Sequence, residues 1–445
     1  MTIPTADPDK PDDTLRGSLL IYVTAIVAGV LIGFIGGVFR WCLKTAERLR
    51  IDLVDWAHKL AGPGWLVPVA AAAAGAILAA LIVRWQPLAA GSGIQHVEAV
   101  YEGEVQPPLI RLLPAKFVGG LLGIGSGLTL GREGPTVHMG AAIGAEAARR
   151  ARLPDSQVRM MQTALGGAGL AVAFNAPVGG TLFTLEEVTK SFRVRTVLAT
   201  LFAASAAVAC SRVVLGNRAD FQVGPIGTPA LAWLPLFVVF GLLTGFLGAV
   251  YNGLILWFLD HVAAIRRIPT LAKAAVIGAI IGLAMFVYPL AVGGGDPLTQ
   301  EILGARHLAL SVVVGYLAVR FIAGPLSYSA AVPGGLFAPL LAVGALWGLL
   351  FTSGFSAVWP WHASQLAVPM ALVGMAAFFG ATIRAPVTGM VLVAEMTATT
   401  EVLVPMMAAT AAAVLAAHAV RSRPIYDSLR ERMPDETSIQ RRGYG

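Results

Sequence analysis

Charge is the scarcest feature of this chain. Lys, Arg, Asp and Glu supply 13% of the 445 residues, about half of the roughly 25% that is usual for a soluble globular domain. Apolar residues take the place of the missing charge, since they make up 56% of the chain and give a mean hydropathy of +0.74. This composition excludes a soluble globular protein and predicts a protein that crosses a membrane many times.

Cysteine and the common catalytic motifs are also nearly absent. Cys42 and Cys210 are the only two cysteines, which is too few for a disulfide framework or a metal-binding pattern, so we expect both to be packing residues. The sequence contains no His-Glu-x-x-His zinc motif and no Gly-x-Ser-x-Gly nucleophile motif. We therefore expect no enzymatic activity and no resident cofactor.

The few charges that are present are mostly positive and lie beside apolar segments. The net charge is +7, and the basic residues cluster at 44–50, 149–152, 190–195, 266–267 and 421–442. No soluble basic domain is present to bind nucleic acid, so the positive-inside rule assigns these clusters to cytoplasmic flanks. The first sixteen residues are polar and lack the pattern of a signal peptide. We expect a multi-pass protein of the cell (inner) membrane with both termini in the cytoplasm.

One acidic residue stands in a segment that otherwise suits the membrane interior. Glu133 lies in Gly131-Arg132-Glu133-Gly134-Pro135, between the Gly-rich apolar stretches 116–130 and 136–148. Hydrocarbon offers a carboxylate no water, so an ionised group at this depth is costly and usually functional. Each stretch is shorter than the roughly 20 residues of a spanning helix. We predict two half-length helices that meet at a transport site, where backbone N–H groups face an anion. The alternative is a surface loop in which Arg132 and Glu133 pair.

The chain repeats itself. Residues 29–38 match 241–250 at an offset of 212 (241 − 29), residues 131–144 match 335–348 at 204 (335 − 131), and residues 176–186 match 385–395 at 209 (385 − 176). Three matches in one order at nearly constant offset indicate an internal duplication, and transporters built this way bind substrate where the repeats meet. We predict the following division: cytoplasmic tail 1–16, membrane repeat 17–215, connection 216–229, membrane repeat 230–432 and cytoplasmic tail 433–445.

Four short motifs give the chain a resemblance to a known family. They are Gly91-Ser92-Gly93-Ile94, Gly131-Arg132-Glu133-Gly134-Pro135, Gly335-Leu336-Phe337-Ala338-Pro339, and Tyr426 within Arg423-Pro424-Ile425-Tyr426-Asp427. In this order they resemble the CLC family of chloride channels and proton/chloride antiporters, in its prokaryotic type without CBS domains. The resemblance implies an all-α polytopic membrane fold of two inverted repeats with many tilted, partly broken helices. It also implies a homodimer with a pore in each subunit.

The same resemblance assigns the residues that would bind the anion. Ser92 and Tyr426 would donate their hydroxyls to a central chloride, and the backbone N–H groups of Leu336 and Phe337 would face them. Donors without a full positive charge suit this task, because they hold a dehydrated anion and still let it leave. Without the motifs, Ser92 would be interpreted as a small packing residue and Tyr426 as an aromatic anchor at the membrane interface.

Two glutamates carry the predicted proton coupling. By resemblance, Glu133 is the gating glutamate, whose ionised side chain occupies an anion position and whose protonated form swings away. Glu187 matches the inner proton-transfer glutamate that antiporters of the family keep and many channels replace. Its alternative role is a helix-end charge paired with Lys190 or Arg193. The two glutamates together favour a proton-coupled chloride antiporter, and a passive chloride-selective channel of the same family is the alternative.

Other polar residues near the motifs are expected to be structural. We interpret Glu98 and Glu395 as structural or auxiliary groups, and Arg132 as an anchor of the helix break or an electrostatic bias for anions. His96 and His138 are expected to be hydrogen-bonded packing residues.

At Gln95 the chain departs from the family pattern, which commonly has proline there. Proline would pre-set the first helical turn, whereas glutamine adds an N–H group and a polar side chain. The sequence alone does not determine how this glutamine affects the geometry of the helix start or the transport rate.

Two interpretations from other classes of protein compete with transport. Gly293-Gly294-Gly295-Asp296 resembles the Gly-x-Gly-Asp pattern of intramembrane aspartyl proteases, but the Tyr-Asp pair Tyr426-Asp427 follows this motif instead of preceding it. A non-transporting scaffold would leave the glycine breaks and carboxylates unexplained. The expected partners are chloride, protons, other small anions such as nitrate, membrane lipid and a second copy of the chain, without nucleic acid.

Overall fold

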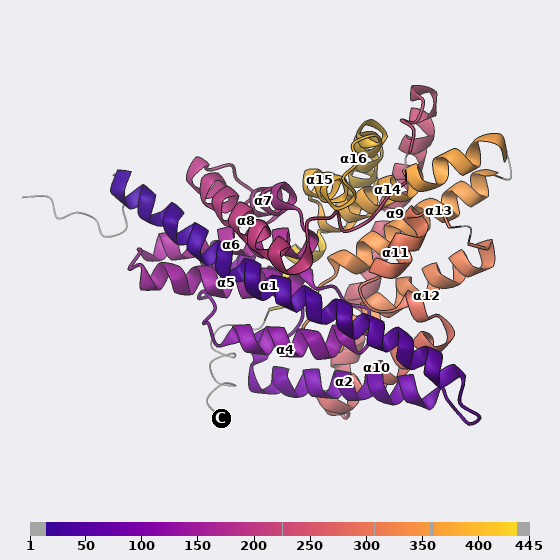
Figure 1. Ribbon diagram of the computed structural model, residues 1–445, viewed down its shortest axis with the longest axis horizontal. Helices are drawn as coiled ribbons and strands as arrows, with labels where there is room; N and C mark the ends of the chain where they lie inside the picture. Colours follow the sequence, from indigo (N-terminus) through magenta and orange to yellow (C-terminus); the bar gives the residue numbers. More distant parts are fainter. Residues whose placement is uncertain (1–14, 225, 307, 357–359, 434–445) are drawn as a thin grey trace, which may run out of the picture.

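The computed structural model describes residues 15–224, 226–306, 308–356 and 360–433. The predicted tails at 1–16 and 433–445 therefore lie almost wholly outside the described residues. Helices make up nearly all of the regular structure of the described part, and the chain order is shown in Figure 1. The first group is α1 (Leu15–His58), α2 (Leu66–Trp85), η1 (Pro87–Ala89), α3 (Ile94–Tyr101), α4 (Leu112–Gly125), α5 (Glu133–Arg150), α6 (Asp155–Phe174), α7 (Pro177–Phe183), η2 (Thr184–Val188) and α8 (Val194–Leu215). The second group is η3 (Leu231–Trp233), α9 (Leu234–Ala264), α10 (Thr270–Val287), η4 (Pro289–Ala291), α11 (Asp296–Leu303), α12 (Leu310–Tyr328), α13 (Phe337–Ser356), α14 (Pro360–Ile383), α15 (Pro386–Thr397), α16 (Leu403–Ala419) and α17 (Ile425–Arg430).

Eight helices of the described part are long and apolar enough to cross a membrane, namely α1, α2, α8, α9, α10, α12, α13 and α14. The longest of them, α1, has 44 residues and is about 66 Å long at 1.5 Å per residue. This length exceeds the hydrocarbon thickness of about 30 Å, and Figure 1 shows α1 running diagonally across the molecule. The helix continues through residues 44–50, and Arg50 is buried. The basic cluster therefore belongs to the helix itself, and its place at a cytoplasmic flank stays a prediction.

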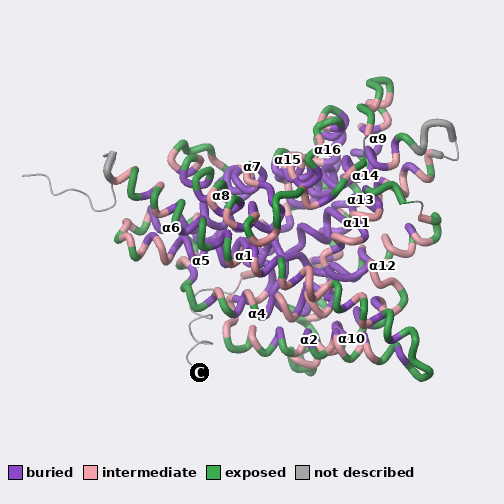
Figure 2. The backbone as a smooth tube through the Cα atoms, in the orientation of Figure 1, coloured by how far each residue is buried: buried purple, intermediate pink, exposed green. Residues whose placement is uncertain are grey.

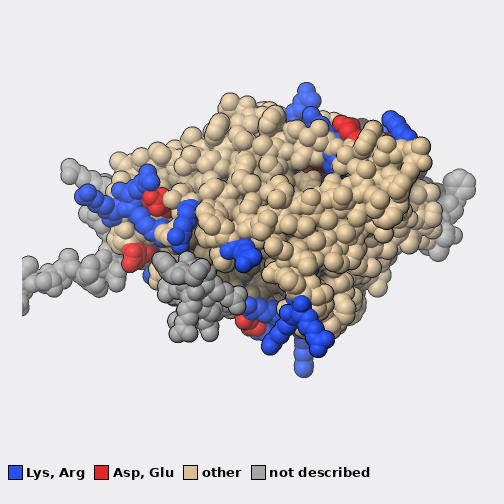
Figure 3. All heavy atoms as spheres, turned by 90° about the horizontal axis from the view of Figure 1, so that it is seen from below, with Lys and Arg blue, Asp and Glu red and all other residues tan. Residues whose placement is uncertain are grey.

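The most buried helices lie at the centre and are covered by apolar helices on the outside, as Figure 2 shows. In α14, 94% of the most apolar 18-residue window is buried, whereas in α2 the corresponding share is 28%. Outer helices keep large apolar side chains exposed, as expected where lipid replaces water. Figure 3 shows that Lys and Arg gather in a few groups on the face in view, with a wide uncharged surface between them. The chain is a multi-pass membrane protein.

Both halves of the chain contain helices that pack closely through glycine residues. In the first half, Gly29 and Gly33 of α1 pack on the backbone of Ala203 and Ala207 in α8, and a Cβ atom at either glycine would collide with the carbonyl oxygen opposite. In the second half, Gly241 and Gly245 of α9 pack in the same way on Ala409 and Ala413 of α16. Small residues let two backbones approach closely inside a membrane protein. These contacts confirm the duplication predicted from the match of residues 29–38 with 241–250.

A reciprocal pair of carboxylates also links the two halves. Glu186 accepts hydrogen bonds from the backbone N–H groups of Val387 and Thr388 at 3.1 and 2.7 Å, at the start of α15. Glu395 accepts from Val178 and Gly179 at 3.1 and 2.7 Å, at the start of α7. Each carboxylate thus supplies acceptors for the free N–H groups at the first turn of a helix in the other half. The interpretation of Glu395 as a structural residue is confirmed.

We predict that Gly245→Ala lowers the thermal stability of the detergent-solubilised protein, by the equivalent of about 1–3 kcal/mol, because the added methyl group overpacks a tight contact. Gly253→Ala on the same helix is the matched control, since a Cβ atom there has nothing within 4 Å. This control should be neutral or slightly stabilising, because alanine is the better helix former by up to about 1 kcal/mol. The melting temperature of each purified variant tests the prediction, and equal values for both variants would contradict it.

Candidate functional site

Two helices begin at a contact between equivalent residues of the two halves. Gly131 and Gly335 donate backbone hydrogen bonds to each other, both at 2.8 Å, in an isolated antiparallel bridge. Two residues after each glycine a helix starts, α5 at Glu133 and α13 at Phe337. An antiparallel bridge between equivalent residues is what two inverted repeats produce. A Cβ atom at either glycine would collide with the Glu133 carboxylate, so a side chain at these positions would displace the carboxylate from its place.

The predicted helix break before Glu133 is confirmed, with one difference in length. Helix α4 ends at Gly125 after 14 residues, which span about 21 Å. Helix α5 begins at Glu133 and continues to Arg150, so it has 18 residues and is longer than the stretch 136–148 predicted. Its first turn is formed by the motif itself, because Pro135 is tolerated in a first turn, where the N–H group has no helical partner.

Glu133 is fully buried and faces the start of the other helix. Its exposed fraction is 0%, and its Oε1 atom accepts a hydrogen bond from the backbone N–H of Phe337 at 2.6 Å. Its Oε2 atom has no hydrogen-bond partner among the described residues. The start of a helix carries free N–H groups and a partial positive charge, which favour an anion. The carboxylate therefore lies where a small anion could bind, and the surface-loop alternative is wrong.

Aromatic packing holds Phe337 in place. Its ring contacts four other rings, with centroid distances from 4.7 to 6.4 Å: Phe174, Phe183, Phe379 and Tyr426. Leu336 and Phe337 are both 0% exposed. This packing fixes the direction of the first N–H groups of α13, since a rigid ring cluster leaves the first turn little freedom to move.

Ser92 and Tyr426 come together at the same place. Both are 0% exposed, and neither hydroxyl has a hydrogen-bond partner in the described structure. The two hydroxyls are adjacent, the Tyr426 ring packs edge-on against Phe337, and a Cβ atom at Gly134 would collide with the Ser92 Oγ atom. Buried hydroxyls without partners are uncommon in folded proteins. The arrangement leaves two donors free next to the Glu133 carboxylate.

A buried lysine supports the turn that carries Ser92. The Lys116 Nζ atom donates hydrogen bonds to the carbonyl oxygens of Gly91 and Ser92, at 2.8 and 3.1 Å. The sequence analysis missed this residue. A lone charge in the apolar, Gly-rich helix Leu112–Gly125 was the signal that could have identified it, since ionisable groups at membrane depth usually have a specific role.

Glu187 lies in a π-helical turn, η2, directly after α7. Its exposed fraction is 3%, and a second buried carboxyl group, Glu98, lies within electrostatic reach of it. Lys190 pairs with Asp427 at 2.8 Å instead. None of the ion pairs found in the described part joins Glu187 to Lys190 or Arg193, and the charge of Lys190 acts on Glu187 only from a longer distance.

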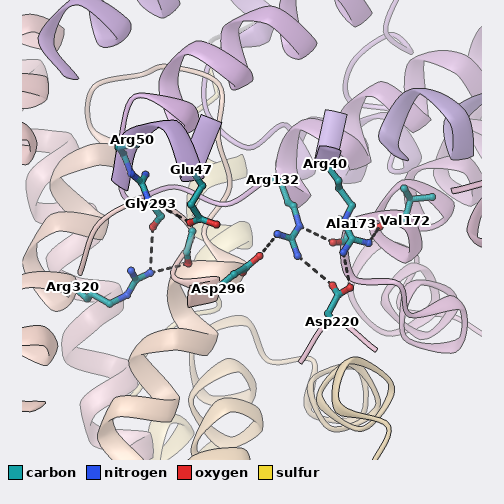
Figure 4. A network of polar contacts seen from close by, with 11 residues as sticks. Arg40, Glu47, Arg50, Arg132, Val172, Ala173, Asp220, Gly293, Asp296 and Arg320 are labelled. Atoms are coloured by element: carbon teal, nitrogen blue, oxygen red, sulfur yellow. Dashed lines mark hydrogen bonds and ion pairs between the residues drawn. The ribbon is translucent and has the colours of Figure 1, made fainter. Parts of the chain in front are cut away.

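A network of buried charges surrounds the start of α5, as Figure 4 shows. Arg132 pairs with Asp296, bonds to Asp220 at 3.3 Å and donates its Nε–H to the carbonyl oxygen of Ala173 at 2.8 Å. Arg40 of α1 bonds to the same Asp220 at 2.6 Å. The network ties the helix break to α1, α6 and α11, so the interpretation of Arg132 as an anchor is confirmed. Asp296 is engaged in this network, which further weakens the protease interpretation.

A basic pocket opens beside this network. Its volume is about 560 Å³, and its lining includes Asp220 together with five basic side chains: Arg40, Lys44, Arg48, Arg212 and Arg218. On the other side of Asp296, Arg320 donates to the carbonyl oxygens of Ala291 and Gly294 at 3.1 and 2.8 Å. The excess of positive charge raises the local concentration of small anions near Arg132.

The remaining polar residues behave as expected. His96 and His138 are buried and hydrogen-bonded to each other at 3.2 Å. Gln95 occupies the second position of α3, which starts normally at Ile94 after Gly93 in the left-handed region. Glutamine in place of proline therefore leaves the helix start intact. Both cysteines are free thiols, Cys42 and Cys210.

Comparison with known proteins identifies similar chains. A family model described as voltage gated chloride channel matches residues 74–418. The H(+)/Cl(-) exchange transporter ClcA of Vibrio parahaemolyticus is 34% identical over 429 residues, which cover 94% of this chain and 91% of that protein. The ClcA exchange transporter of Citrobacter koseri is 33% identical over 423 residues, with coverage of 92% and 88%. A solved structure of a slow cyanobacterial Cl-/H+ antiporter has a TM-score of 0.86 at 29% identity and covers 93% of this chain and 97% of that one.

We predict that Asp220→Asn destabilises the protein by about 3–5 kcal/mol, because it leaves the charges of Arg40 and Arg132 partly uncompensated in a buried site. Asp260→Asn is the matched control, since Asp260 pairs with Arg432 where both side chains are exposed, at 59% and 41%. An exposed pair contributes only about 0–1 kcal/mol. Thermal unfolding of both variants in detergent is the measurement, and a loss of similar size in both would show that the buried network is not important for stability.

Proposed function

Because the chain belongs to the voltage-gated chloride channel (CLC) family, we propose that it is a proton-coupled chloride antiporter, which exchanges chloride for protons through a pore in each subunit. The similar proteins from Vibrio parahaemolyticus and Citrobacter koseri are both named as H(+)/Cl(-) exchange transporters, which supports this proposal. The observation that carries it is the position of the Glu133 carboxylate. A titratable anion is bound to the Phe337 N–H group, directly beside two buried hydroxyls that have no partner.

Chloride would bind between neutral donors. We assign the hydroxyls of Ser92 and Tyr426 and the backbone N–H groups of Leu336 and Phe337 to this role. The anion loses its hydration shell on entry, and several neutral dipoles replace that shell without holding the ion as tightly as a buried cation would. Lys116 acts through the backbone of the Ser92 turn and positions the donors instead of binding the ion itself.

Proton coupling would follow from competition for these donors. While it is ionised, Glu133 occupies the Phe337 N–H group and excludes chloride from that position. Protonation removes the charge that the helix start favours, so the side chain leaves and chloride takes its place. One carboxyl group then links proton uptake to anion movement without any other moving part.

Glu187 would serve the proton path on the cytoplasmic side. It is 3% exposed, and no ion pair among the described residues holds it permanently ionised. A buried, unpaired carboxyl group can take up and release a proton, which a salt-bridged group resists. This feature favours the antiporter over the passive chloride channel, for which a proton-carrying group on the inner side has no use.

We extend the proposal to the setting of the protein. It would work in the cell (inner) membrane as a homodimer surrounded by lipid, with no resident cofactor and no nucleic-acid partner. Nitrate and other small anions would compete with chloride, because the neutral donors of the site recognise charge and size more than chemical identity.

The decisive test is the reversal potential of the purified protein in liposomes under crossed chloride and proton gradients. An antiporter reverses between the chloride and proton equilibrium potentials, whereas a passive channel reverses at the chloride potential alone. A wild-type reversal at the chloride potential would reject the antiporter in favour of the channel.

We predict that Glu133→Gln, which mimics the protonated side chain, abolishes proton coupling while chloride still moves. Its reversal potential should shift to the chloride potential. Glu146→Gln on the same helix is the control, because Glu146 pairs with the largely exposed Arg150 away from the helix start. Proton uptake driven by a chloride gradient at the wild-type rate in Glu133→Gln would contradict the gating role.

We predict that Glu187→Gln stops proton transport and leaves substantial chloride flux, since this residue serves only the proton path. The control is Glu102→Gln, which changes an exposed carboxylate at the end of α3. Chloride and proton fluxes recorded from the same liposomes give the coupling ratio. An unchanged ratio in Glu187→Gln would mean that the residue has no part in proton transfer.

A further inference from the structure

A third hydroxyl lies at the Ser92 turn. Tyr328 is the last residue of α12 and is 4% exposed. Its phenol oxygen is 3.5 Å from the backbone nitrogen of Ser92, a long contact in which the N–H group points to the oxygen. The same oxygen faces the α-carbon of Gly91, since a Cβ atom built there would lie 3.2 Å from it. The ring thus enters the site from a helix that none of the sequence motifs includes.

The hydrogen bonds of this phenol are incomplete. Its oxygen accepts from Ser92 and lies beside the side chain of Gln95, and the Oε1 atom of Gln95 has no partner among the described residues. A phenol can donate one hydrogen bond in addition to those it accepts. None of the hydrogen bonds among the described residues has the Tyr328 hydroxyl as its donor. A buried donor without an acceptor is costly, so an acceptor from outside the chain is expected.

The neighbouring groups show what kind of acceptor fits. The hydroxyls of Ser92 and Tyr426 are likewise buried and unpaired, and Tyr328 lies within electrostatic reach of both Tyr426 and Glu133. Three hydroxyl donors that lack acceptors are therefore grouped around one turn. A single small anion can accept hydrogen bonds from all three hydroxyls at once.

We propose that Tyr328 is a third hydroxyl donor to the central chloride, and that Gln95 positions its phenol. The inference rests on the proposed function and adds a specificity-determining residue to the same site. The Gln95 side chain lies beside the phenol. Proline, which is common at this position in the family, has no side-chain donor to offer the phenol oxygen. The glutamine and the tyrosine therefore work as a pair: the amide holds the oxygen, and the phenol hydrogen is left for the anion.

The first test is the affinity for chloride. Chloride is titrated calorimetrically into the detergent-solubilised protein, with Tyr328→Phe as the variant and Tyr316→Phe as the control. Tyr316 lies on the same helix but packs against Tyr288, away from the Ser92 turn. Loss of a hydrogen bond to a charged partner should weaken chloride binding about tenfold or more, with no change in the control. Gln95→Pro, which removes the side chain beside the phenol but keeps the phenol itself, should weaken binding by less than Tyr328→Phe does.

The outcomes separate the two proposals. If wild-type protein releases no heat on chloride titration, both the anion site and the third donor are rejected. If wild type and Tyr328→Phe bind chloride with equal affinity, only the third donor is rejected and the proposed function stands.

A second measurement does not depend on any variant. Crystals of wild-type protein grown with bromide locate the anion by its anomalous scattering. A bromide within about 3.5 Å of the Tyr328 phenol oxygen, near the upper limit for a hydrogen bond to a large anion, supports the proposal. A bromide that contacts Ser92 and Tyr426 alone overturns it, even if Tyr328→Phe fails to fold.

Discussion

The reciprocal hydrogen bonds between Gly131 and Gly335 are the constraint on which the rest of the site depends. They join equivalent residues of two inverted repeats at 2.8 Å, so two helix starts are forced to meet in the middle of the protein. The N–H groups of one start then face the carboxylate carried by the other. Because a Cβ atom at either glycine would collide with the Glu133 carboxylate, glycine at the crossing of both repeats leaves the carboxylate its place. The symmetry of the backbone brings the two helix starts together, and the asymmetry of the side chains places glutamate on α5 and phenylalanine on α13 at the proposed anion site.

The surrounding packing keeps this geometry rigid in different ways on its two sides. Four aromatic rings fix Phe337 on the side of α13, whereas a buried network of arginines and aspartates fixes Arg132 on the side of α5. Apolar packing is insensitive to charge and tolerates the arrival of an anion. In the ionic network Arg132 is paired with Asp220 and Asp296, so it holds the backbone with its charge largely compensated. The two kinds of support together leave neutral dipoles as the groups that face the pore.

Much of this organisation is visible in the sequence because it is local. The helix break before Glu133, the glycine repeats and the positions of Ser92, Leu336, Phe337 and Tyr426 follow from short motifs. The partners of those motifs were not visible, because they come from distant segments: Lys116 supports Ser92 across 24 residues and Asp220 joins Arg40 to Arg132 across 180 and 88 residues. Hydropathy also failed to show that α1 passes unbroken through the charged residues 44–50, where Arg50 is buried and pairs with Glu47. A sequence pattern shows which residues are unusual, but the fold determines what they touch.

The reciprocal caps formed by Glu186 and Glu395 bear on how such a protein could have arisen. Each carboxylate accepts hydrogen bonds from the start of a helix in the other half of the chain. This reciprocal pattern is the one that a two-fold symmetric dimer shows. A chain of half this length could form both caps by pairing with an inverted copy of itself. Gene fusion would then convert an assembly of two identical subunits into one polypeptide without a single new contact at these helix ends. After fusion, the side chains of each half could change independently, provided that each half kept the glutamate that caps a helix of the other half.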